Sequence, residues 1–188
     1  MSVVLAYADE HMAVVASDGR VVDNENNIVQ EDFNKTVKVN KKTILGFAGE
    51  ASPCQYIVNL IQNSEHKEYV ERLFPEDIVL FIERLLSDAP EYIKCCFIVC
   101  GTGKNGRICI SRVETGQCAT IHYPEPGMSH YDGAYPSEET AKLDIYHQNL
   151  EKHLPDIMCA LEETIRAISN RSPSVNENMF YQIVHVGH

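Results

Sequence analysis

The second residue of the chain is a serine, and a serine at an amino terminus can combine two catalytic groups in one residue. Amide hydrolysis needs a nucleophile, a base beside it and hydrogen-bond donors for the oxyanion. Once Met1 is removed, the Ser2 hydroxyl can attack, and its free α-amine, with an ordinary pKa of roughly 7.7–8.0, can take the proton. Ser2 taken alone is only the residue after the start methionine, so this prediction depends on motifs farther along the chain.

Four short motifs follow one another in a fixed order. They are Ser2-Val3-Val4, Val15-Ala16-Ser17-Asp18-Gly19-Arg20, Asn34-Lys35-Thr36-Val37 and Leu45-Gly46-Phe47-Ala48-Gly49. In this order and at close to this spacing, they resemble the proteasome β-subunit family and its bacterial relative, the HslV peptidase. A weaker similarity continues to Gly116. Each motif alone is weak, whereas the ordered set is specific for these N-terminal-nucleophile hydrolases.

The resemblance implies catalytic roles for three further residues. Lys35 matches the active-site lysine, whose positive charge favours the neutral form of the α-amine and polarises the serine hydroxyl. Asp18 matches the carboxylate that keeps this lysine charged and in place. Gly49 matches the glycine whose N–H points at the oxyanion, where the missing Cβ lets the substrate approach. Without the family pattern, these residues would be a surface lysine, an Asp-Gly turn and a strand-to-helix break.

The resemblance also implies a substrate pocket. Its expected lining is Val21, Phe33, Phe47 and Ala51. All four side chains are apolar, which predicts a preference for a hydrophobic side chain before the cleaved bond.

The family pattern weakens in the second half of the chain. Asp132-Gly133 stands where a Ser-Gly pair is usual, and residues 169–174 offer serines but no clear aspartate. We assign no catalytic role to either region.

Apolar runs and turn signals predict the elements that must position these residues. Strands are expected at 3–7, 12–16, 36–39, 43–49, 95–100, 107–113, 119–123 and 179–186. One helix is expected to start at Ser52, as N-cap before Pro53 with Gln55 closing a capping box, and a second at Pro75. Two more are expected over 137–150 and 156–168, and the polar stretch 23–32 is expected to be a loop.

This order of elements favours an α+β fold with two mostly antiparallel sheets. Each sheet would be covered on its outer side by a helix pair, giving a four-layer αββα sandwich. The spacing supports two sheets but leaves the layer order open, whereas the resemblance implies the N-terminal-nucleophile hydrolase fold. We find no internal repeat or linker, so residues 1–188 are expected to form one domain.

Composition excludes several classes of function. The net charge of −11 argues against nucleic-acid binding, because phosphate contacts need a basic face. No signal peptide or membrane span is recognised, so a cytoplasmic location is expected. The seven cysteines fall mostly in apolar runs and are interpreted as reduced core thiols. None of the eight histidines is assigned to a metal, and no cofactor is expected.

The resulting hypothesis is a peptidase that acts on peptides or unfolded proteins. By resemblance only, it would assemble as a homo-oligomer, in a ring or a related assembly, and could have an ATPase unfoldase as partner. Two alternatives stay open: a catalytically silent subunit with a structural or binding role, and an amidase of the same superfamily that acts on a non-protein amide.

Overall fold

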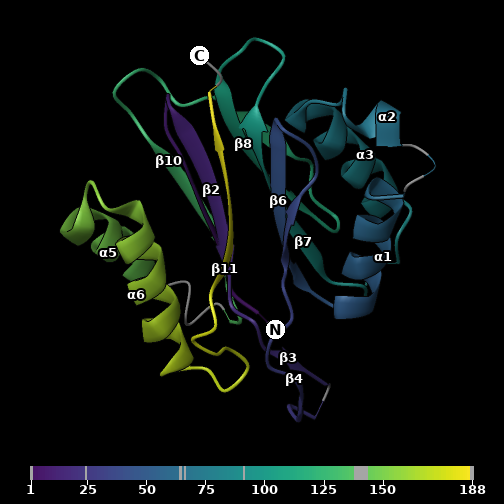
Figure 1. Ribbon diagram of the computed structural model, residues 1–188. Coiled ribbons are helices and arrows are strands. Elements are labelled where there is room, and N and C mark those ends of the chain that lie inside the picture. Colours follow the sequence, from purple (N-terminus) through teal and green to yellow (C-terminus); the bar gives the residue numbers. More distant parts are fainter. Residues whose placement is uncertain are drawn as a thin grey trace.

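The fold consists of two antiparallel sheets packed face to face, with helices on both outer faces (Figure 1). The computed structural model describes residues 2–23, 25–63, 65, 67–90, 92–137 and 144–186. One sheet has the strand order β10-β1-β2-β11 and the other β5-β6-β7-β8-β9. The predicted α+β sandwich with layer order αββα is therefore confirmed.

The four-stranded sheet contains β1 (Val4–Ala8), β2 (Met12–Ser17), β10 (His130–Ala134) and β11 (Phe180–His185). The five-stranded sheet contains β5 (Thr36–Lys38), β6 (Thr43–Gly49), β7 (Cys95–Thr102), β8 (Ile108–Glu114) and β9 (Thr120–His122). Successive side chains of a strand point to opposite faces. On β1, Val4 and Ala6 therefore face the other sheet, whereas Leu5 and Tyr7 face the helices.

Helices cover the outer face of each sheet (Figure 1). The five-stranded sheet carries α1 (Ala51–Ile61) and α3 (Pro75–Ser87), with the short α2 (Lys67–Val70) between them in sequence. The four-stranded sheet carries α5 (Ile145–His153) and α6 (Ile157–Ser169). The four longer helices bury residues at helical spacing, such as Ile57 and Ile61 on α1 or Leu161 and Ile165 on α6. The molecule thus has three apolar layers, one between the sheets and one under each group of helices.

The first helix starts earlier than the sequence predicted. Its N-cap is Glu50 rather than Ser52, and no side chain caps it. The backbone N–H of Cys54 donates to the carbonyl of Glu50, which closes the first turn directly after β6. Pro53 then sits in the first turn, where a missing N–H costs little because those donors have no partner inside the helix.

Three other local predictions need correction. The stretch 23–32 is not all loop, because β4 (Ile28–Gln30) pairs with β3 (Val21–Val22) in a small hairpin. Strand β10 was missed, since its sequence has no apolar run, yet it pairs with β1 along its whole length. Of the helix expected over 137–150, residues 138–143 lie outside the described part, and the described helix extends to His153.

The cysteines are free, and most of them belong to the core. Five are buried, whereas Cys118 is exposed and Cys159 is half-buried. The interpretation as packing residues holds for the buried five. Within the described ranges, none of the helices has the length and apolar character needed to cross a bilayer.

Candidate active site

A single cavity gathers the predicted site residues. It has a volume of about 580 Å³, and Ser2, Lys35 and Gly49 all line it. The four predicted pocket residues line it as well: Val21, Phe33, Phe47 and Ala51. Asp18 is fully buried and holds Lys35 in place. Met1 lies outside the described residues, so its predicted removal stays a prediction.

The lysine is held by three oxygen atoms. Its Nζ donates to the Asp18 carboxylate Oδ1 at 2.8 Å, to the Asp18 carbonyl at 3.2 Å and to the Arg20 carbonyl at 2.6 Å. The Lys35 side chain is 3% exposed and that of Asp18 is 0% exposed. These acceptors match the three donors of an ammonium group, so the charged lysine is fixed in one position.

The backbone around Asp18 explains how the pair is placed. Asp18 follows β2 directly, and its carboxylate accepts hydrogen bonds from the N–H groups of Val3 and Arg20 at 3.0 Å and 2.8 Å. The carbonyl of Lys35 accepts from the N–H of Phe47 on β6, which fixes the lysine directly before β5. One carboxylate therefore ties the amino-terminal segment, the turn after β2 and the lysine together.

Burial and the ion pair act on Lys35 in opposite directions. Removal from water lowers the pKa of Lys35, and the negative charge of Asp18 only partly offsets this. The net direction is downward, and Asp18 limits how far the pKa of Lys35 falls. Such a buried cation can favour a neutral amine beside it, which is the state that a base needs.

Gly49 ends β6 in a backbone conformation that suits glycine. Its φ is +113°, and a Cβ added there would lie 2.1 Å from the carbonyl oxygen of Lys94. The chain must turn here from β6 into α1, with the N–H of Glu50 donating to the same Lys94 carbonyl. Gly49 lines the cavity, and only glycine fits there because the Lys94 carbonyl occupies the place of a Cβ.

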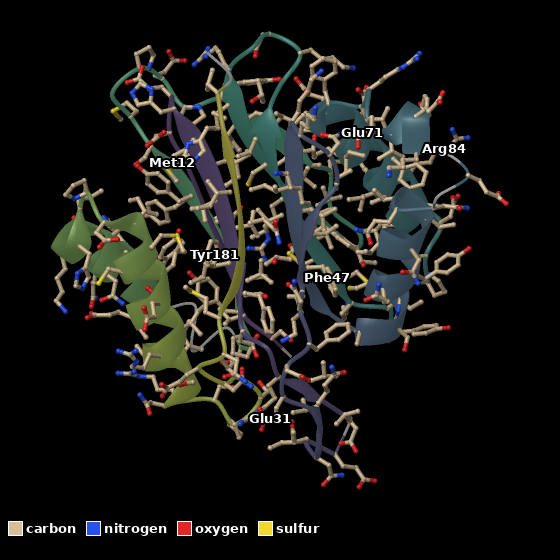
Figure 2. The ribbon with its side chains drawn as sticks, in the orientation of Figure 1. Met12, Glu31, Phe47, Glu71, Arg84 and Tyr181 are labelled. Atoms are coloured by element: carbon tan, nitrogen blue, oxygen red, sulfur yellow. The ribbon has the colours of Figure 1, made fainter. Side chains whose placement is uncertain are left out.

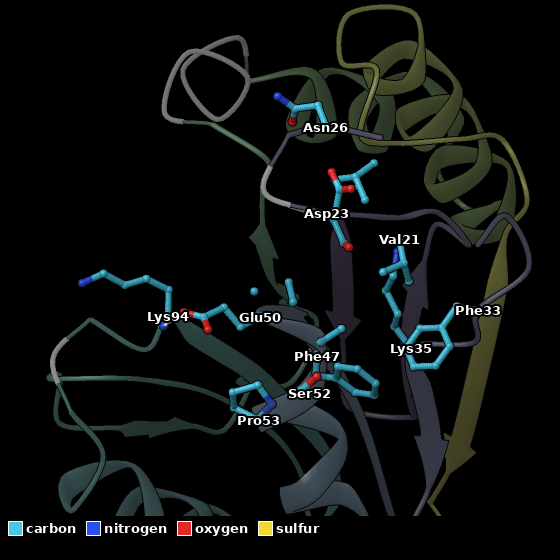
Figure 3. A pocket seen from close by; sticks show the side chains of 15 residues that line it. Val21, Asp23, Asn26, Phe33, Lys35, Phe47, Glu50, Ser52, Pro53 and Lys94 are labelled. Atoms are coloured by element: carbon cyan, nitrogen blue, oxygen red, sulfur yellow. Dashed lines mark hydrogen bonds between the residues drawn. The ribbon is translucent and has the colours of Figure 1, made fainter. Parts of the chain in front are cut away.

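The cavity has an apolar part and a charged part. Figure 3 shows Val21, Phe33 and Phe47 close to Lys35, with the two aromatic rings in an edge-to-face contact at 6.2 Å. The lining also includes charged and polar residues to which the sequence analysis gave no role in the site: Asp23, Asn26, Glu50 and Lys94. Lys94 lies far from the apolar group in this view. One apolar subsite with a polar extension is therefore available to a bound chain.

A second set of contacts, also missed by the sequence analysis, supports the turn at Asp18. Asn176 is buried, and its Oδ1 accepts from the N–H of Gly19 at 2.9 Å. Its Nδ2 donates to the carbonyl of Glu31, whose carboxylate pairs with Arg20. Figure 2 shows Glu31 beside the β3–β4 hairpin. This network fixes the backbone of Arg20, whose carbonyl is one of the three acceptors of the Lys35 Nζ.

The residues at the two positions where the family pattern weakens make contacts of their own. Asp132 accepts from the Arg112 guanidinium at 3.2 Å and from the N–H of Gly133. Ser172 and Ser174 form a hydroxyl pair at 2.9 Å. None of these residues is among those that line the cavity.

The layered fold and the amino-terminal cavity define the class of N-terminal-nucleophile hydrolase folds. Residues 2–114 match the family described as proteasome subunit, and the chain belongs to that family. Among solved structures, it is similar to eukaryotic HslV from Trypanosoma brucei, with a TM-score of 0.71 and 14% sequence identity. That match covers 97% of this chain and 99% of the other. No curated protein matches the sequence.

Proposed function

We propose that the chain is a proteasome-type peptidase whose nucleophile is Ser2 after removal of Met1. Membership of the proteasome subunit family supports a peptidase of this type in general. The observation that carries the finer assignment is the buried Lys35–Asp18 pair, which reaches the cavity that Ser2 and Gly49 also line. Burying a charged lysine costs free energy, so its position beside the cavity favours a role in catalysis over a role in stability.

In this mechanism, the α-amine of Ser2 takes the hydroxyl proton as Oγ attacks the peptide carbonyl. The ammonium of Lys35 opposes protonation of the amine in the resting enzyme and stabilises the developing alkoxide. The N–H of Gly49 donates to the oxyanion. The C–N bond then breaks, the leaving amine takes the proton, and water hydrolyses the Ser2 ester by the same route in reverse.

The decisive experiment combines intact mass with covalent labelling of the protein from its own host. We expect a mass that lacks one methionine and a single adduct of a peptide epoxyketone or vinyl sulfone at Ser2. The matched control is Ser17→Ala, since Ser17 is buried in β2 and should not affect labelling. Labelling that survives in Ser2→Ala, or a fully retained Met1, would contradict the assignment.

One observation favours the silent-subunit alternative. Asp132 stands where the family usually has serine, and its carboxylate is engaged by Arg112. A retained Met1 together with no turnover would support that alternative. Turnover of a simple amide but of no peptide would instead support the amidase.

The apolar subsite leads to a prediction about specificity. Peptides with a leucine or phenylalanine before the cleaved bond should be cut at least tenfold faster than peptides with lysine or glutamate there, since that side chain would rest on Phe33 and Phe47. Fluorogenic peptides that differ at this one position measure the ratio of kcat/KM. Faster cleavage after a charged residue would refute the subsite, while leaving the role of Ser2 intact.

The assembly is also a proposal. We infer from the family a homo-oligomer and a peptide or unfolded-protein substrate, and native mass spectrometry tests the first. An ATPase partner and a cytoplasmic location stay predictions.

A further inference from the structure

A second cluster of reactive side chains lies in the helical layer outside the four-stranded sheet. His153 is the last residue of α5, and Cys159 and Glu163 lie one helical turn apart on α6. One ligand atom from each of the three residues lies within 4.8 Å of the other two. All three side chains are partly exposed, so solutes can reach them.

The contacts within this cluster bring together the donor types that zinc prefers. The Cys159 sulfur lies 3.4 Å from Nδ1 of His153, and the Glu163 carboxylate lies 2.8 Å from Nε2 of the same ring. Zinc bonds of ordinary length at a tetrahedral angle place sulfur and nitrogen about 3.6 Å apart. The thiol and imidazole are therefore near a ligating separation, and Glu163 needs only to swing its half-exposed carboxylate from one side of the ring.

The surroundings of the thiol favour a cation. Three carboxylates lie near the thiol and make the local potential negative: Asp156 accepts from the Cys159 N–H at 3.1 Å, and Glu162 and Glu163 follow on α6. A divalent ion would neutralise this charge. Lys152 opposes it, because its Nζ donates to Glu163 at 2.8 Å. That lysine side chain is 61% exposed and can move into water when an ion takes its place.

We propose that His153, Cys159 and Glu163 form a zinc site that clips the end of α5 to α6. Zinc displaces the thiol proton to solvent and is bound by the thiolate sulfur, the imidazole Nδ1 and a carboxylate oxygen, with water in the fourth position. The site is independent of the proposed peptidase activity. Its residues lie six and four positions apart, so no short sequence motif marks them.

Cobalt(II) is the probe for this site, because a thiolate–cobalt bond gives a near-ultraviolet charge-transfer band. Titration of the full-length protein with the Cys118→Ser substitution should produce this band, and one equivalent of zinc should remove it. The substitution matters because Cys118 is the exposed cysteine and would otherwise bind metal on its own. Adding Cys159→Ser should abolish the band, and adding Glu163→Gln or His153→Ala should weaken metal binding at least tenfold.

Alkylation of Cys159 tests the site without changing any of its three ligands. In the Cys118→Ser protein, zinc should slow iodoacetamide labelling of Cys159 at least tenfold, as located by peptide mass. Labelling that zinc leaves unchanged, or a cobalt band that persists without Cys159, would overturn the site. The cluster would then be a hydrogen-bonded chain that holds the two helices together.

Discussion

Replacing Lys35 by alanine is expected to lower peptide turnover by about 10²–10⁴-fold, the range for loss of one group that assists proton transfer. Among the described residues that line the cavity, two carry a side-chain cation, Lys35 and Lys94. Lys94 lies at the other end, so the substitution removes the cation beside the apolar subsite. Without it, the α-amine of Ser2 has no nearby cation to oppose its protonation. Steady-state kcat/KM for a hydrophobic fluorogenic peptide measures the effect. Lys38→Ala is the matched control, because Lys38 is an exposed lysine on β5, three residues after Lys35.

Stability has to be separated from catalysis in this experiment. Removing Lys35 leaves the Asp18 carboxylate buried without its cation, which costs about 3–5 kcal/mol of folding free energy. The double variant Asp18→Asn/Lys35→Met removes both charges and should recover part of that stability, as measured by thermal unfolding. It should stay inactive. A folded Lys35 variant with unimpaired turnover would show that the lysine has only a structural role.

The sequence predicted best those features that a local pattern or a family motif marks. Strand β6 was predicted with its bounds, because its apolar run ends in a glycine whose positive φ no other residue adopts easily. The apolar strand runs and the helical stripes of α1 and α6 predicted two sheets with helices outside, whereas the αββα layer order came from the family resemblance. Lys35, Asp18 and Gly49 could be named because the family motif places them, and the fold brings all three to one end of the sandwich.

What the sequence could not predict depends on contacts between distant segments. The hydrogen bond from Gly19 to Asn176 joins positions 157 apart, and no periodicity marks either end. Strand β10 has histidine, tyrosine, aspartate and glycine in its first four positions, so its pairing with β1 has no local signal. The start of α1 was misplaced since the turn at Gly49 and the Cys54–Glu50 bond outweigh the favourable cap residues at Ser52.

The second large effect is expected from Gly49→Ala, which should reduce both stability and turnover. A positive φ strains any residue other than glycine by about 1–3 kcal/mol. At Gly49 the added Cβ would also meet the Lys94 carbonyl at 2.1 Å, so the junction between β6 and α1 has to shift. Because the Gly49 N–H is the proposed oxyanion donor, we expect a loss of about 10²–10³-fold in kcat for the molecules that still fold.

Gly106→Ala is the control that separates backbone strain at a positive φ from the steric collision of an added Cβ. Gly106 also has a positive φ, of +79°, but an added Cβ there has nothing within 4 Å. It lies in the turn between β7 and β8 and is not among the residues that line the cavity. This control should lose stability through strain alone and keep its turnover. If Gly49→Ala behaves in the same way, with normal kcat per folded molecule, the backbone at Gly49 does not stabilise the oxyanion, and that donor must be sought elsewhere on the cavity wall.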